Sequence, residues 1–103
     1  MKKMITGVEV EVNEEGYFMN PAEWTESMAH EIAKEEGIDP LTDMHFKLIR
    51  YLREQQAKGA ALTIRGINKS GVLTTKEFYD LFPGGPLKKA SKIAGIPKPV
   101  GCV

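Results

Sequence analysis

The first eighteen residues alternate between apolar and polar side chains, as a half-buried β-strand does. The clearest run places a glutamate between each pair of three valines, Val8, Val10 and Val12. This period of two puts the valines on one face and the glutamates on the other. Thr6-Gly7 and the residues 13–16 provide turn signals. The pattern predicts a small antiparallel hairpin or three short strands over residues 2–18, with the valine face packed against helices.

Apolar residues then recur at helical spacing. Asn20 followed by Pro21 and Glu23 is typical of a helix start with a cap, and the apolar stripe after it consists of Trp24, Met28 and Ile32. We expect one helix from Asn20 to Gly37, where the glycine ends it. His30 is expected on its solvent face.

Four more helices are predicted further along the chain. A long helix begins at 39–42 and ends near Gly59, with His45 as an orienting or capping residue and with apolar positions Met44, Leu48, Ile49, Tyr51 and Leu52. Short helices follow at 62–70, closed by Gly71, then from Thr74 or Thr75 to Phe82, and at 87–94. A turn at 83–86 precedes the last helix.

After Gly95 the chain changes character. Pro97 and Pro99 disfavour a helix and favour an extended, polyproline-like segment, and Gly101 allows a swivel before Cys102. The predicted fold class is therefore α+β and mostly α. It is a small helical bundle with a helix-turn-helix-like unit, an N-terminal β-hairpin and an extended C-terminal arm. We expect a compact domain over 1–95 and a flexible arm over 96–103 that carries the cysteine.

Composition and charge narrow the function classes. The 103 residues have ordinary globular usage and a formal net charge of zero, but residues 1–54 hold 12 acidic and 6 basic residues whereas 55–103 hold 2 and 8. This split argues against a uniformly basic nucleic-acid-binding domain and is compatible with a basic face for an acidic partner, or with attraction between the halves. No apolar run approaches membrane-span length. We expect a cytoplasmic protein, because a lone cysteine fits a reducing compartment.

Cys102 is the strongest nucleophile in the sequence. A thiol reacts as its thiolate. Burial as a small apolar residue is the commoner fate of free cysteines, but a cysteine near the tip of a Pro/Gly arm has little core to enter.

His30 and His45 lack partners at metal-ligand spacing, so we expect no metal site and no cofactor. The two short helices around Gly71 leave DNA binding open as an alternative. Glu77 and Asp80 argue against it, because DNA phosphates repel carboxylates.

The segment Gly95–Val103 resembles the C-terminal arm of the DsrC/TusE/DsvC sulfur-relay family, which includes proteins described as the gamma subunit of dissimilatory sulfite reductase. The resemblance extends to Asp80–Pro86, to Tyr51–Glu54 with Thr42 and His45, and to Gly16–Phe18 and Trp24. It implies a helical domain with a hairpin and a mobile arm. It also implies that the penultimate cysteine, Cys102, accepts sulfane sulfur as a persulfide and delivers it when the arm enters a partner protein.

The resemblance also assigns supporting roles. Arg65 matches a family arginine, and both it and Lys98 are candidates for neutralising a thiolate or a sulfur oxyanion. Members that serve dissimilatory sulfite reductase have a second cysteine eleven positions before the arm cysteine, where this chain has Ser91. Because serine forms no disulfide, we expect this chain to resemble the single-cysteine members of the family. The stretch between Lys69 and Phe78 also lacks an insertion found in many relatives.

The expected function is a cytosolic, sulfurtransferase-type carrier rather than a stand-alone catalyst. Its expected partners are an upstream sulfur donor protein and a downstream acceptor enzyme, either sulfite reductase or the tRNA thiolation machinery, with no membrane partner. Two alternatives stay open. One is a DNA-binding or redox-sensing regulator that uses the helix-turn-helix unit, and the other is an accessory subunit of a reductase that docks without transferring sulfur.

Overall fold

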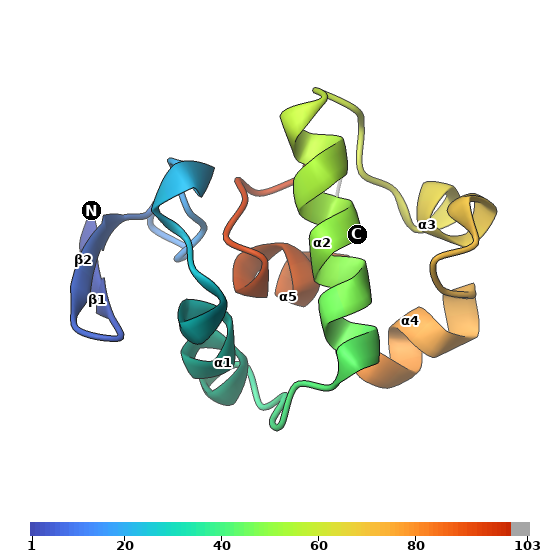
Figure 1. Cartoon of the computed structure of the whole chain (residues 1–103), viewed down its shortest axis with the longest axis horizontal. Helices are drawn as coiled ribbons and strands as arrows, with labels where there is room; N and C mark the ends of the chain where they lie inside the picture. The colour runs from blue at the N-terminus through green and yellow to red at the C-terminus, as the bar shows by residue number, and fades with distance from the viewer. Residues whose placement is uncertain (100–103) are drawn as a thin grey trace.

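The computed structural model describes residues 1–99 of the chain, and residues 100–103 lie outside the described part. In Figure 1 the N-terminal hairpin lies at one end of the molecule and the helices extend from it to the other end. The strands are β1 (Lys2–Ile5) and β2 (Val8–Glu11). A 3-10 turn (Pro21–Glu23) is followed by α1 (Glu26–Glu35), α2 (Asp43–Ala57), α3 (Ile64–Ser70), α4 (Thr75–Leu81) and α5 (Pro86–Ile93). The predicted α+β class, mostly α with an N-terminal hairpin, is confirmed.

The hairpin forms where the alternation predicts it. β1 and β2 pair antiparallel with Lys2 opposite Glu11, and Thr6 and Gly7 both adopt positive φ angles at the turn. Val10 and Val12 are buried as expected, but Val8 is 48% exposed, which corrects the expectation that all three valines face inward. Val8 follows the turn directly, and α1 packs against β1 rather than covering this end of β2.

The single helix predicted from Asn20 to Gly37 is wrong: two pieces occupy this stretch. The Asn20 side chain caps only the 3-10 turn, and both Trp24 and Thr25 are extended, so α1 begins at Glu26. Glu23 does not reach back to the cap, because its carboxylate accepts a hydrogen bond from the Glu11 amide. The break lets the Trp24 side chain leave the helical stripe and reach α2 and α5.

The histidines lie as predicted. His45 completes a capping box with Thr42 at the start of α2, where its Nδ1 accepts from the Thr42 amide at 3.0 Å. Its Nε2 then donates to the Leu81 carbonyl at 2.9 Å, which ties α2 to the end of α4. His30 is exposed on α1, with its ring 5.2 Å from that of Phe46. Both predictions follow from residue type and spacing alone.

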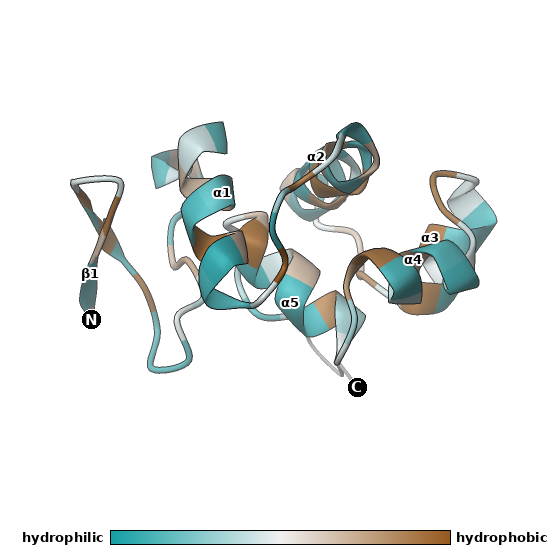
Figure 2. Cartoon of the chain, turned by 90° about the horizontal axis from the view of Figure 1, so that it is seen from below, coloured by the Kyte–Doolittle hydropathy of each residue, from teal (hydrophilic) through white to brown (hydrophobic). Residues whose placement is uncertain are grey.

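The later helices are close to their predicted bounds. Thr63 caps α3 at its start and Gly71 is its C-cap, and Thr74 forms a capping box with Glu77 at the start of α4. Pro86 is the first residue of α5 rather than the last residue of the preceding turn. Figure 2 shows hydrophilic and hydrophobic residues following one another along α1, α4 and α5, as amphipathic helices require.

One continuous core joins these elements. Its largest fully buried side chains are Phe18, Phe78, Phe82, Ile5, Met28, Ile32, Leu48, Ile49, Leu52, Ile67, Leu73 and Ile93. Ile96 belongs to this core with 0% exposure, although the predicted boundary placed it in the arm. Packing of the chain onto the domain therefore extends beyond Gly95. Within residues 1–99, no helix has the length and apolar character that crossing a membrane requires.

Candidate functional site

The candidate site is built around the start of the C-terminal arm, because two of the predicted site residues, Gly101 and Cys102, lie outside the described residues. The described part of the arm begins where α5 ends. The amides of Ala94, Gly95 and Ile96 donate to the carbonyls of Ala90, Lys92 and Ser91 at 2.8, 3.2 and 3.2 Å. These bonds close the last turn of α5 and direct the chain toward Pro97.

Arg53 of α2 holds this turn from the side. Its Nη1 donates to the carbonyls of Ala94 at 2.9 Å and Gly95 at 3.4 Å, and its Nη2 donates to the carbonyl of Pro21 at 3.0 Å. Partial burial lowers the pKa of the guanidinium, but arginine stays protonated in proteins. Arg53 thus supplies donors to carbonyls that the end of a helix leaves without partners.

Trp24 completes the arrangement. Its ring centroid lies 4.2 Å from the Arg53 guanidinium carbon, and its indole nitrogen donates to the Ile93 carbonyl at 2.9 Å. Gly95 has a φ of +69°, and a Cβ added there would lie 2.1 Å from Trp24 Cδ1. Only glycine fits at this point, because any side chain would meet both the indole and an unfavourable backbone conformation. We call Trp24, Arg53 and Gly95 the arm-root clamp.

Lys98 makes a second attachment further along the arm. Its ammonium donates to both carboxylate oxygens of Glu15, at 2.9 and 3.1 Å. The hydrogen bond from Lys98, together with the charges of Lys98, Lys88 and Lys92, lowers the pKa of the Glu15 carboxyl, and desolvation opposes this shift only in part. The predicted supporting residue Lys98 is therefore engaged by the N-terminal turn in this structure.

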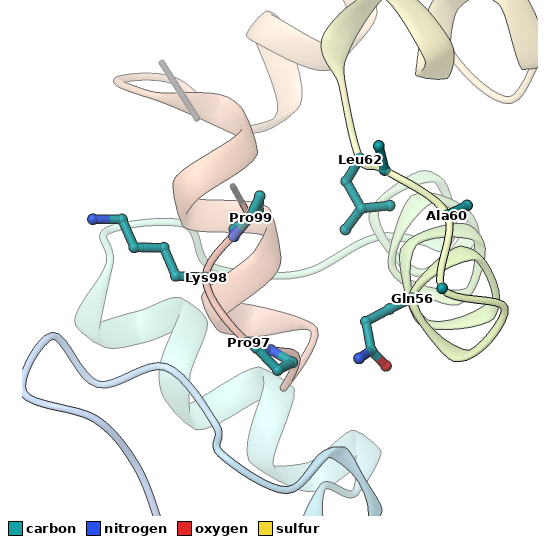
Figure 3. Close-up of a pocket in the computed structure, with 8 residues that line it drawn as sticks. Gln56, Ala60, Leu62, Pro97, Lys98 and Pro99 are labelled. Carbon is teal, nitrogen blue, oxygen red and sulfur yellow. The ribbon is translucent and has the colours of Figure 1, made fainter. Parts of the chain in front are cut away.

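A groove of about 340 Å³ separates the arm from the end of α2 and the connection to α3. Gln56 and the small residues 59–61 line one side with Leu62, and the segment Pro97–Pro99 lines the other. In Figure 3 Gln56 and Leu62 lie across the groove from the two prolines, whereas the Lys98 side chain extends away from it. The two arm prolines thus form one wall of an open, mostly apolar depression.

The remaining predicted site residues lie apart from each other. Ser91 is on the buried face of α5 with 0% exposure, and its Oγ has no hydrogen-bond partner among the residues described. Arg65 is exposed on α3. The structure does not bring Arg65 together with Lys98, and its role in neutralising a thiolate stays a prediction. No cluster of three metal-ligating side chains occurs within residues 1–99.

Comparisons with known proteins place the chain in a family. The family model described as "DsrC like protein" matches residues 4–103, which is nearly the entire chain. The chain belongs to the DsrC family. The resemblance suggested by the arm sequence is thereby confirmed, and the family match includes the segment that carries Cys102.

Individual members of the DsrC family support the same assignment. The gamma subunit of dissimilatory-type sulfite reductase from Nitratidesulfovibrio vulgaris is 38% identical over 98 residues, covering 94% of this chain and 93% of the relative. The sulfurtransferase TusE of Shigella dysenteriae serotype 1 is 37% identical over 105 residues, covering 94% and 95%. The crystal structure of the oxidized gamma subunit (DsrC) from Archaeoglobus fulgidus superimposes with a TM-score of 0.79 at 35% identity, covering 100% of both chains.

The sequence did not reveal the clamp or the Glu15 attachment. The spacing of Trp24 predicts a core residue of a helix, and Arg53 stands out only as part of a run that resembles the family's central helix. The partners of Arg53 are backbone carbonyls 32 to 42 residues away, and backbone carbonyls leave no signal in residue type. One available signal was an arginine beside the buried stripe of α2, where a long side chain can reach over apolar neighbours.

Proposed function

We propose that this DsrC family member is a sulfur carrier that takes up sulfane sulfur as a persulfide on Cys102 and hands it to a partner protein. The observation that carries the proposal is the family match, which extends to residue 103 and so includes the chain's only cysteine. The names of the relatives, a sulfurtransferase and a sulfite reductase gamma subunit, support a role in sulfur relay.

The chemistry of the carrier needs one thiol and no external oxidant. The Cys102 thiolate attacks the outer sulfur of a donor persulfide, so that a new bond forms to Cys102 Sγ while the donor's S–S bond breaks. The donor leaves as a thiolate and the proton stays on the transferred sulfur. Transfer to the acceptor repeats this exchange in the forward direction. Arg65 and Lys98 are the proposed cationic groups for the thiolate, and Lys98 must first leave Glu15 to serve there.

Ser91 limits the proposed chemistry. A hydroxyl at this position forms no disulfide with Cys102, so we propose a carrier that works through one persulfide and does not cycle between a dithiol and an internal disulfide. The proposed partners are a donor protein and an acceptor enzyme, which is either a sulfite reductase or a tRNA thiolation enzyme. We propose a cytoplasmic location, where thiols are kept reduced.

The alternative functions have weaker support. For DNA binding, α4 would have to approach phosphates with exposed Glu77 and Asp80, and its Lys76 is already paired with Asp80 at 3.3 Å. An accessory subunit that docks without transferring sulfur is compatible with the name of the gamma-subunit relative. It differs from the carrier in one respect, because docking does not require the thiol.

Intact-mass spectrometry after incubation with inorganic polysulfide tests the proposal. The native chain is expected to gain one or more sulfur atoms that a reductant removes, and the Cys102→Ser variant is expected to gain none. If Cys102 reacts with an alkylating agent but takes up no sulfur, the carrier function is wrong and the docking role takes its place. Salt-dependent binding of the Cys102→Ser variant to duplex DNA would instead favour the regulator.

A further inference from the structure

The last carbonyl groups of α5 are held by side chains from distant parts of the chain. Trp24 binds the carbonyl of Ile93, and Arg53 binds those of Ala94 and Gly95. Three successive carbonyls at the base of the arm are therefore fixed by directional hydrogen bonds. The same guanidinium also holds Pro21, so the segment before Trp24 and the segment after α5 are tied to one group.

These contacts satisfy the guanidinium donors and also fix the groups that they join. Arg53 has no ion pair among the residues described, and burial disfavours its charged form, as the lowered pKa of the guanidinium records. Such a group is costly to bury unless all its donors are used. A planar fork with several donors can fix the relative orientation of the groups it joins, which a lysine or an apolar residue cannot.

Gly95 is the point at which orientation matters most. It has a positive φ, and the indole leaves no space for a side chain there. Seven positions separate Gly95 from Cys102 in the sequence, so the clamp lies at the start of the segment that carries the thiol. Directly after Gly95, Ile96 is packed in the core and Lys98 is paired with Glu15, so the clamp acts together with these contacts on the path of the chain up to Pro99.

We propose that Arg53, supported by Trp24, is a positioning residue for Cys102: the arm-root clamp fixes the backbone at Ile93–Gly95 and so sets the direction in which the chain enters the arm. This inference rests on the proposed function, since Cys102 is the group that needs positioning. The clamp acts on Ile93–Gly95 and makes no chemical contribution to sulfur transfer. It limits the directions in which the chain can continue from Gly95 and so favours delivery of the thiol to a partner that docks in one orientation.

The chain contains the two probes needed for the test. Trp24 is its only tryptophan and Cys102 its only cysteine. A fluorescent acceptor such as AEDANS on Cys102 allows time-resolved energy transfer from Trp24, and the unlabelled form of each variant gives the donor lifetime. The distance distribution is compared in the native chain, Arg53→Ala, Arg53→Lys and the control Arg50→Ala, which removes an exposed arginine from the same helix.

The distribution is expected to broaden roughly twofold in Arg53→Ala, because the backbone at Gly95 regains conformational freedom. Arg53→Lys keeps the charge but lacks the fork, so it should broaden as well, and Arg50→Ala should match the native chain. A native distribution in folded Arg53→Ala overturns the proposal. A native distribution in Arg53→Lys overturns the claim that the fork sets the direction.

Hydrogen exchange gives a second test that does not depend on Arg53→Ala folding. Trp24→Phe keeps a ring but removes the bond to Ile93. Exchange of the Gly95 and Ile96 amides should accelerate at least about fivefold, the effect expected from losing one hydrogen bond, while amides in the middle of α2 keep their rates. Uniform acceleration, or none, contradicts a local clamp. Neither measurement involves sulfur, so failure of the clamp and failure of the carrier function are distinguishable.

Discussion

The guanidinium carbon of Arg53 lies 4.2 Å from the centroid of the Trp24 ring, although 28 residues separate them in the chain. Cation–π contacts of this kind are worth about 0.5–2 kcal/mol, depending on solvent access. Here the pair also donates hydrogen bonds to the end of α5. The contact therefore links the helix that organises the core to the base of the arm that carries the cysteine.

Gly95→Ala should destabilise the domain. The new methyl group would meet the Trp24 ring, and the positive φ would be unfavourable, so overpacking and backbone strain together should cost about 2–5 kcal/mol of the free energy of unfolding. Urea denaturation measures this loss. Gly59→Ala is the matched control, because Gly59 has a similar φ of +75° with no atom within 4 Å of an added Cβ. Equal losses in the two variants would show that the indole does not restrict residue 95.

Lys98→Ala should raise the pKa of the Glu15 carboxyl toward its ordinary value, because the hydrogen bond from Lys98 is the largest cause of its lowering. An NMR titration of the Glu15 side-chain carboxyl carbon measures the change. Lys88→Ala, which removes a charge without a hydrogen bond, should shift the pKa less. Identical Glu15 titrations in the native chain and Lys98→Ala would contradict the attachment.

The same pair gives the arm contact a definite pH dependence. The pKa of Glu15 is lowered in the folded protein, so the contribution of the pair is fully present above the unfolded-state pKa of the carboxyl. It is lost as the pH falls through the lowered folded-state value. The difference in the free energy of unfolding between the native chain and Lys98→Ala should shrink over that acidic interval, and also with added salt, because both groups are near the surface. A difference between the two chains that grows as the pH falls through this interval would contradict the predicted sign.

Ser91→Ala should stabilise the domain by about 1 kcal/mol. The Ser91 hydroxyl is fully buried and has no partner within residues 1–99, so its removal relieves an unmet desolvation cost at nearly constant volume. Thermal denaturation of Ser91→Ala against the native chain measures the difference. A loss of stability would contradict an unmet desolvation cost at Ser91.

Much of the fold follows from local signals in the sequence. Several features depend on residues at most a few positions apart: the Thr6-Gly7 turn, the Thr74–Glu77 capping box, the C-cap at Gly71 and the capping by His45. Short-range rules predict them because the interacting atoms are neighbours in the chain. The arm sequence likewise predicted the family.

The errors lie where distant segments meet. Trp24 continues a helical stripe by spacing, yet it leaves the helix because its indole finds Arg53 and Ile93 across the core. Val8 fits the strand pattern but lies beyond the cover of α1, and Ile96 follows an expected boundary but fills the core. Tertiary contacts determine whether each of these side chains is buried or exposed. Rules based on neighbouring residues do not include such contacts.

Sulfur release tests the central claim most directly. The chain is loaded with inorganic polysulfide, freed of excess reagent and mixed with cyanide, which removes the outer sulfur of a persulfide as thiocyanate and returns Cys102 to a thiolate. We expect one thiocyanate for each sulfur atom that the loaded chain has gained, matched by return of the intact mass to that of the unloaded chain, and none from Cys102→Ser. Equal thiocyanate from the native chain and from Cys102→Ser would contradict a carrier role for Cys102.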